Sequence, residues 1–279
     1  MATPPSSIQN TINTWAPPII GGPLSVYAGA AVKNASTFHS NAPNTPISII
    51  TQKVRAQGLL YGASSAAKAA PLQYGLLGPL YHAVLKKSES KEVAVGVTCL
   101  GTQLVTYVPQ TKQVQVVGTH GQHSMPKRFS FSPKDTVRWV GISLTGPGAL
   151  SFAGRNVATL IGLRYATEPC TQFWTKHLPA AISKEHPHII TVLGQYSGNF
   201  GGGVLSALPN SSHQQISVQA VKKPNTPYSL ISHLNPRFMT TQIGLRILYN
   251  TFVFGTFGST EKLIHALTNK TSQALSHQD

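Results

Sequence analysis

Long runs without a charged side chain are the first pattern along this sequence. No Asp, Glu, Lys or Arg occurs in residues 1–32, 34–52, 69–85, 93–111 or 186–221. Such runs match or exceed the roughly 20 residues that a helix needs to cross a bilayer. Gly, Ser, Thr, Asn, Gln and Pro interrupt their apolar residues, as in packed helices around a wet cavity. The pattern predicts membrane-spanning helices that form a bundle.

An internal repeat organises these runs. Three segments begin with small residues, reach a proline and end in a polar stretch with Gln, and these are residues 21–57, 96–118 and 198–219. A second uncharged stretch that closes with an aromatic side chain follows each of them. Three pairs predict six helices in a single domain over residues 1–279, with repeats at about 15–87, 92–169 and 187–267.

Three prolines, Pro46, Pro109 and Pro209, stand at matching positions of the repeats. Proline inside a helix removes a backbone hydrogen bond and bends the helix. Three bends at the same depth would lean three helices toward a common axis. We therefore expect these prolines to be helix kinks that narrow one end of the bundle.

The repeats resemble the mitochondrial carrier family. PISIITQKVRAQG (46–58) and GGGVLSALPNSSHQQISVQ (201–219) are most similar to it, and LLYGASSAAKAAP (59–71) and GLRILYNTFVFGTF (244–257) add to the likeness. The resemblance covers residues 15–267 and implies an all-α membrane protein with six transmembrane helices in three pseudo-repeats. It also implies solute transport by alternating access across the mitochondrial inner membrane.

The charged gate motif of that family, Pro-x-[Asp/Glu]-x-x-[Lys/Arg], is altered in this chain. Ser48, Thr111 and Ser211 occupy the acidic positions, and the basic positions hold Thr51, Val114 and Gln214. The salt bridges that close family members cannot form, so hydroxyl and amide hydrogen bonds would have to join the helices at this gate.

The altered gate leaves two rival interpretations open. One is a carrier-derived membrane protein that no longer transports and serves for interaction or insertion. The other is a carrier mimic that a pathogen delivers into the mitochondria of a host cell.

The excess of basic over acidic side chains indicates which partners the protein binds. Lys and Arg number 22 against 7 Asp and Glu, and only 10% of residues are charged, against roughly 25% in an ordinary soluble domain. A nucleic-acid binder would show long basic clusters beside aromatic side chains, which this sequence lacks. We therefore expect an anionic solute and anionic membrane lipids as partners, no nucleic acid, and a monomer.

Cations in the middle of uncharged segments are candidate solute contacts, because each costs about 2.5–3.5 kcal/mol to insert. They are Lys68, Arg155 and Arg246. The resemblance places Lys68 and Arg246 at solute-binding positions. A direct overlay places residues 152–154 at the third position, whereas a slip of two places Arg155 and Asn156 there.

Cations that converge without a carboxylate imply an anionic solute, and nucleotides or other phosphate-bearing metabolites are favoured. The alternative is that each cation reaches to an interface or binds a backbone carbonyl.

Other motifs point away from catalysis. Cys99 and Cys170 have no metal-ligand spacing, and the seven carboxylates are scattered through loops and termini. GNFGGG at 198–203 lacks the Lys-Ser/Thr pair of a phosphate-binding loop, so close helix packing is the better interpretation. We expect no enzyme activity, no cofactor and no bound metal.

Overall fold

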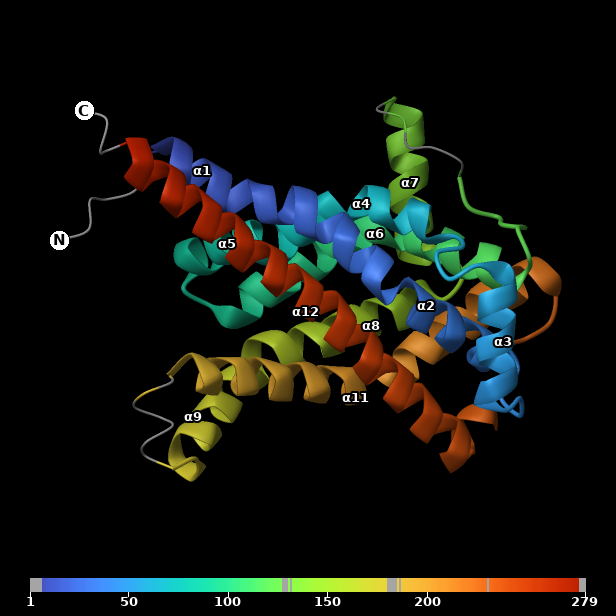
Figure 1. Ribbon diagram of the computed structural model, residues 1–279. Helices are drawn as coiled ribbons and strands as arrows, with labels where there is room; N and C mark the ends of the chain where they lie inside the picture. Colours follow the sequence, from blue (N-terminus) through green and yellow to red (C-terminus); the bar gives the residue numbers. More distant parts are fainter. Residues whose placement is uncertain are drawn as a thin grey trace.

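The computed structural model describes residues 7–126, 130, 132–179, 185, 187–229 and 231–275, without the side chains of 7, 187 and 269–275 (Figure 1). All regular secondary structure in this part of the chain is helical. The prediction of an all-α chain is confirmed at this level.

Several helices join end to end into long rods. The first rod consists of α1 (Ser7–Ala16), the π-helical turn η1 (Pro17–Gly21) and α2 (Gly22–Asn41). Two further rods are composite, namely α4 (Ala63–Gly75), η2 (Leu76–Leu80) and α5 (Tyr81–Ser88), and α8 (Ala149–Ile161), η3 (Gly162–Ala166) and α9 (Thr167–His177). The longest single helices are α6 (Lys91–Gly118), α11 (Pro187–Lys222) and α12 (Pro236–Leu275).

Caps and turns separate these rods at particular residues. Glu89 has a left-handed φ of 55° after α5, and Ser90 then caps α6 because its Oγ accepts from the Val93 amide at 3.2 Å. Ser132 caps α7 (Pro133–Thr145) in the same way. Two short helices, α3 (Ile47–Gln57) and η4 (Ile231–Leu234), lie in the connections between rods.

The rods pack side by side into a closed ring (Figure 1). Going round the ring, α2 contacts α4, then come α6, α8, α11 and α12, and α12 returns to α2. In addition, α2, α6 and α11 contact one another across the ring. The interior is therefore narrowest where these three helices meet.

Apolar packing lies between neighbouring rods, whereas much of the interior is polar. One apolar cluster joins α2, α4 and α12 through Val26, Ala70 and Val253. The buried polar side chains include Thr111, Gln113, His213, Gln214 and Gln242. Large apolar side chains are exposed on the other faces, for example Leu150 at 87% and Leu234 at 81%.

The prediction of six transmembrane helices in a carrier-type bundle is contradicted. Within the described ranges, no helix is both long enough and apolar enough to cross a membrane. The reason is that an uncharged run need not be an apolar one: α6 buries Thr102, Thr106 and Gln110 on one face, which lowers its mean hydropathy. The description of the chain as a transmembrane carrier rested on these runs and is corrected for the same reason.

The first of the three expected kinks is also corrected. Pro46 lies outside the long helices, because α2 ends at Asn41 and Pro46 is the N-cap of α3 with φ −56° and ψ 144°. Two prolines in APNTP (42–46) favour extended backbone at the preceding residues. Pro109 and Pro209 do lie inside helices, α6 and α11 respectively.

Candidate functional site

Three buried cations, one from each of three rods, lie in the interior of the ring. They are Lys33 of α2, Arg155 of α8 and Arg246 of α12, and their side chains are 7%, 5% and 8% exposed. In the described part of the chain, the ion pair within 4 Å is Lys91–Glu168, which involves none of the three. Burying a charge is costly unless a partner compensates it, so these side chains need an explanation.

Neutral groups hold the two arginines in place. Arg246 donates from Nε to the Ser206 hydroxyl at 3.0 Å and from Nη2 to the Thr159 hydroxyl at 3.2 Å. The Arg155 guanidinium donates to the Asn156 side-chain oxygen at 3.0 Å and lies 3.9 Å from the centre of the Phe152 ring. These contacts orient the guanidinium groups and leave their charges uncompensated.

Burial and mutual repulsion weaken the hold of these groups on their protons. Burial, followed by the charge of Arg246, lowers the pKa of Arg155 to about 9. Burial lowers the pKa of Arg246 to about 10. For Lys33 the same cause, followed by the charges of Arg155 and Arg246, lowers the pKa well below its usual value. The electrostatics of the site therefore favour a negative charge beside them.

A small cavity of about 50 Å³ opens beside the arginines. Arg155, Asn156, Arg246, Thr102 and Asn250 are among the side chains that line it. Within the described residues, Asn156 Nδ2, Thr102 Oγ1 and Asn250 Oδ1 are buried atoms without a hydrogen-bond partner. Two of these three atoms can donate, so the cavity offers unused donors next to two cations.

A larger cavity of about 700 Å³ adjoins this small cavity at one end of the ring. The two cavities share Tyr74, Leu77 and Phe254 in their walls. The exposed side chains of Thr14 and Lys262 stand in the wall of the larger cavity, which therefore reaches the surface. We call this larger cavity the vestibule, because it reaches the surface and shares part of its wall with the cavity beside the arginines.

Neutral hydrogen bonds close the interior on the other side of the cations. The Gln214 side-chain oxygen accepts from the Ser36 hydroxyl at 3.0 Å and from the Ser40 hydroxyl at 2.7 Å. Gln242 accepts from Ser36 at 2.9 Å and donates to His39 at 2.8 Å. Hydroxyls and amides thus join α2, α11 and α12 here, and Gln214 is the one predicted gate residue among these five, which we call the polar plug.

The residues predicted for the gate lie in three different surroundings. Ser48 is exposed on α3, next to Pro46, and is not part of the polar plug. Thr111 is buried and its hydroxyl lies 3.0 Å from His213 Nε2. Ser211 is buried, donates to the Leu208 carbonyl at 3.0 Å and lies 2.9 Å from His233 Nε2.

The structure brings together Arg155, Asn156 and Arg246 and separates Lys68 from them. Lys68 is exposed on α4, because Ala66, Ala67 and Ala70 form the face of that helix that packs inward. Lys33 takes the third position and was missed. Its signal was present in the sequence, since it is the single charge between the uncharged runs 1–32 and 34–52.

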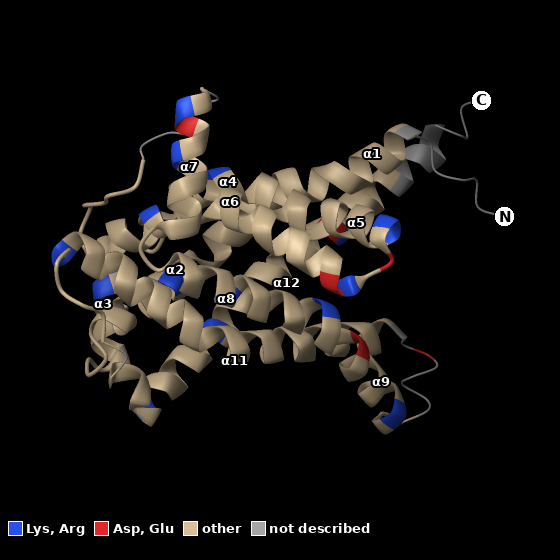
Figure 2. Cartoon of the chain, turned by 180° about the vertical axis from the view of Figure 1, so that it is seen from behind, with Lys and Arg blue, Asp and Glu red and all other residues tan. Residues whose placement is uncertain are grey.

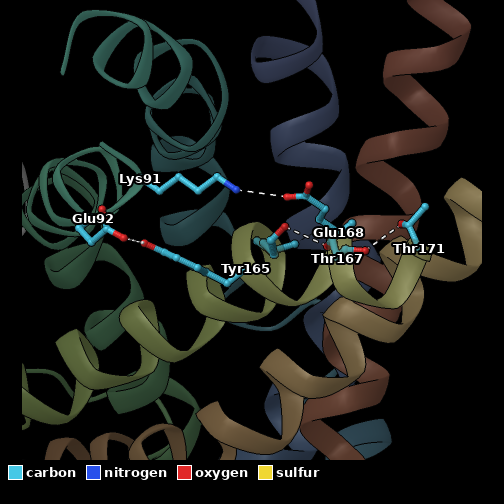
Figure 3. Close-up of polar contacts among 7 residues, drawn as sticks. Lys91, Glu92, Tyr165, Thr167, Glu168 and Thr171 are labelled. Atoms are coloured by element: carbon cyan, nitrogen blue, oxygen red, sulfur yellow. Dashed lines mark hydrogen bonds and ion pairs between the residues drawn. The ribbon is translucent and has the colours of Figure 1, made fainter. Parts of the chain in front are cut away.

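Charged side chains are unevenly distributed over the molecule. Figure 2 shows Asp and Glu mainly at the end where α5 and α9 lie, with Asp135 on α7 as an exception. At that end Lys91 pairs with Glu168 at 3.2 Å, and the Tyr165 hydroxyl donates to Glu92 at 3.2 Å (Figure 3). These contacts are exposed and contribute little to stability, but they join α6 to η3 and α9.

Comparison with known proteins gives no further support for a family. The sequence matches no protein-family model and no curated protein. The resemblance to mitochondrial carriers therefore stays a prediction, and the function rests on the residues of the site.

Proposed function

We propose that this protein binds a small anionic solute between Arg155 and Arg246, with Lys33 adding a third positive charge. The single observation that carries the proposal is a pair of buried arginines that line one cavity, without a carboxylate within ion-pair distance in the described residues. Lys33 lines neither cavity, but it is buried and the charges of both arginines act on it. An anion would offset the repulsion among them and would accept from the unused donors of Asn156 and Thr102.

The chemistry of the donors indicates the class of solute. A guanidinium matches the geometry of a phosphate or carboxylate group because it donates two parallel hydrogen bonds. The small cavity beside the arginines suits one such group, and the vestibule leaves room for the rest of the molecule. Nucleotides and other phosphate-bearing metabolites stay the favoured solutes.

Movement of the solute across a membrane is not part of this proposal. Transport by alternating access stays a prediction without a test. Membership of the carrier family and a mitochondrial location stay predictions without a test.

Equilibrium binding of labelled ATP, orthophosphate and malate to the purified chain tests the proposal. We expect at least one of them to bind, and Arg246→Gln to weaken that binding by about 2 kcal/mol or more, because a charge-assisted hydrogen bond is lost. Lys68→Gln is the matched control, since it removes an exposed cation from a neighbouring rod.

The outcomes separate the site from general charge attraction. Equal losses in the Arg246 and Lys68 variants would mean that the net charge of +15 attracts the anion non-specifically. No binding of any anion would overturn the proposal.

A second candidate function is attachment to an anionic lipid surface, which the exposed apolar side chains favour. Ile231 and Leu234 of η4 are 76% and 81% exposed, and Val137 of α7 is 73% exposed. Lys134 and Arg138 accompany Val137 on α7, so apolar and basic side chains occur together, as at membrane interfaces.

Flotation with lipid vesicles tests this second function. We expect the chain to float with vesicles that contain phosphatidylserine, and Ile231→Ser with Leu234→Ser to reduce the floating fraction. Equal flotation with purely zwitterionic vesicles would contradict a role for the basic side chains.

A further inference from the structure

Lys33 is the member of the site whose charge is held least firmly. Its side chain is 7% exposed, and its Nζ donates to the Gln113 side-chain oxygen at 2.7 Å. An ammonium group has three hydrogens to donate, and this is the one hydrogen bond the described residues give it. Gln113 in turn leaves its Nε2 without a partner.

The charges that act on Lys33 from neighbouring elements are positive. Arg155 of α8 and Arg246 of α12 both repel an ammonium group at this position. From α6 the facing group is the neutral amide of Gln113. Lys68 of α4 and Lys53 of α3 are exposed. No carboxylate in the described ranges lies within ion-pair distance of Lys33.

The remaining ionisable groups of the interior are uncharged. His213 of α11 is buried, and burial together with the charges of Arg155 and Lys33 lowers its pKa well below the usual value. Burial raises the pKa of Tyr107 on α6 and of Tyr74 on α4. None of these groups supplies a negative charge to Lys33.

We propose that the site takes up about one proton from solvent with each anion that it binds, and that the Lys33 amine receives this proton. This inference rests on the anion binding proposed above. In the step, the lone pair of the amine forms an N–H bond with a proton from water or buffer, and no other bond changes. The bound anion supplies the negative charge that the resulting ammonium group lacks in the empty site.

The two arginines do not account for such an uptake near neutral pH. With pKa values of about 9 and about 10, Arg155 and Arg246 already carry their protons there. Lys33 is repelled by both arginines at once, and its primary amine loses a proton more readily than a guanidinium does. Lys33 is also buried, has one hydrogen bond to a neutral amide and has no carboxylate within ion-pair distance in the described residues, so we assign the uptake to it.

Calorimetry of anion binding in two buffers of different ionisation enthalpy tests the proposal. Malate and sulfate serve as probes, because their own protons are lost well below neutral pH. Between about pH 6 and 8 we expect the full-length chain to take up protons with each bound anion, in an amount that rises toward one per anion as the amine of the empty site loses its proton. We also expect its apparent affinity to fall by about tenfold per pH unit above the pKa of Lys33 in the empty site.

Three variants assign the proton to one residue. Lys33→Met should bind more weakly and without proton uptake. Lys33→Arg should bind without uptake because its charge is permanent, which separates the proton from the charge. Lys68→Met, on the exposed face of α4, should keep the uptake of the wild-type chain.

The outcomes distinguish this inference from the proposed function. Binding of malate or sulfate to the wild-type chain without proton uptake would overturn the inference and leave anion binding intact. Uptake that persists in Lys33→Met would overturn the assignment to Lys33. If neither malate nor sulfate binds, this inference fails, and the proposed function fails with it only if ATP and orthophosphate do not bind either.

Discussion

At the scale of single residues, the buried charges that would bind an anion also lower the stability of the empty protein. Arg155 is buried among neutral partners, so its charge destabilises the anion-free fold. In this respect the position resembles other binding sites, where a ligand compensates groups that the empty protein leaves unpaired. Stability and binding should therefore respond in opposite directions to changes here.

Replacement of Arg155 by methionine tests this opposition. We expect Arg155→Met to raise the free energy of unfolding of the anion-free protein by about 1–4 kcal/mol near neutral pH, while it weakens anion binding. Urea denaturation measures the first effect. Lys68→Met should change stability by no more than about 0.5 kcal/mol.

The pH dependence of this gain has a definite sign. Folding lowers the pKa of Arg155 from its ordinary value to about 9, so between the two values the unfolded chain binds more protons and stability rises with pH. The cost of the buried charge is thus fully present below the lower value and is relieved above it. The advantage of Arg155→Met should shrink as the pH rises above that value, and a lower stability of the variant near neutral pH would contradict the argument.

At the scale of elements, glycines decide how closely rods approach. A Cβ on Gly162 in η3 would lie 2.4 Å from the Cα of Gly202 in α11, and a Cβ on Gly198 would lie 2.7 Å from the Gly162 carbonyl oxygen. The interpretation of GNFGGG as a close helix contact is confirmed by these distances. A side chain at this crossing has no room, because backbone atoms rather than flexible side chains stand opposite.

Alanine substitutions within this contact test its importance. We expect Gly162→Ala to lower the free energy of unfolding by about 1–3 kcal/mol, since α11 would have to move away. Gly201→Ala is the matched control, because nothing lies within 4 Å of its Cβ position. It should raise stability by about 1 kcal/mol through its higher helix propensity. Equal thermal melting temperatures for the two variants would argue against tight packing here.

At the scale of the whole molecule, the ring gives the buried site one described entrance. The vestibule reaches the surface near α1, α5 and the second half of α12, whereas α3 lies at the far end of the molecule (Figure 1). The polar plug occupies the path between the cations and that far end. An anion should therefore approach from the vestibule side.

Single charges at the two ends should then affect the rate of association differently. Lys262→Gln, at the vestibule, should slow the association of a fluorescent ATP analogue by about twofold at low ionic strength, through loss of electrostatic steering. Lys53→Gln removes an exposed lysine from α3 at the far end and should have little effect. Stopped-flow fluorescence measures both, and a larger effect of Lys53→Gln would place the entrance at the other end.

The sequence by itself determined the local structure and the unusual residues of this protein. The long uncharged runs predicted helices. The isolated cations within these runs stood out because placing a charge in an uncharged segment costs free energy. Arg155 and Arg246 were found in this way. The same runs gave a wrong prediction of membrane spans. Their polar residues were expected to face a cavity inside membrane-spanning helices, but α6 and α11 bury so many Thr, Ser and Gln side chains that these helices are not apolar enough to span a membrane.

Only the tertiary structure decided which cations meet. Lys68 and Lys33 look alike in sequence, but the rotation of each helix about its own axis places Lys33 inside the ring and Lys68 outside it. That rotation depends on packing with neighbouring rods, as in the alanine face of α4 against α2 and α12. Helices rich in small and neutral residues show little periodic alternation of apolar and polar positions, so the sequence does not fix this rotation. The buried site therefore forms only when the helices pack into the ring.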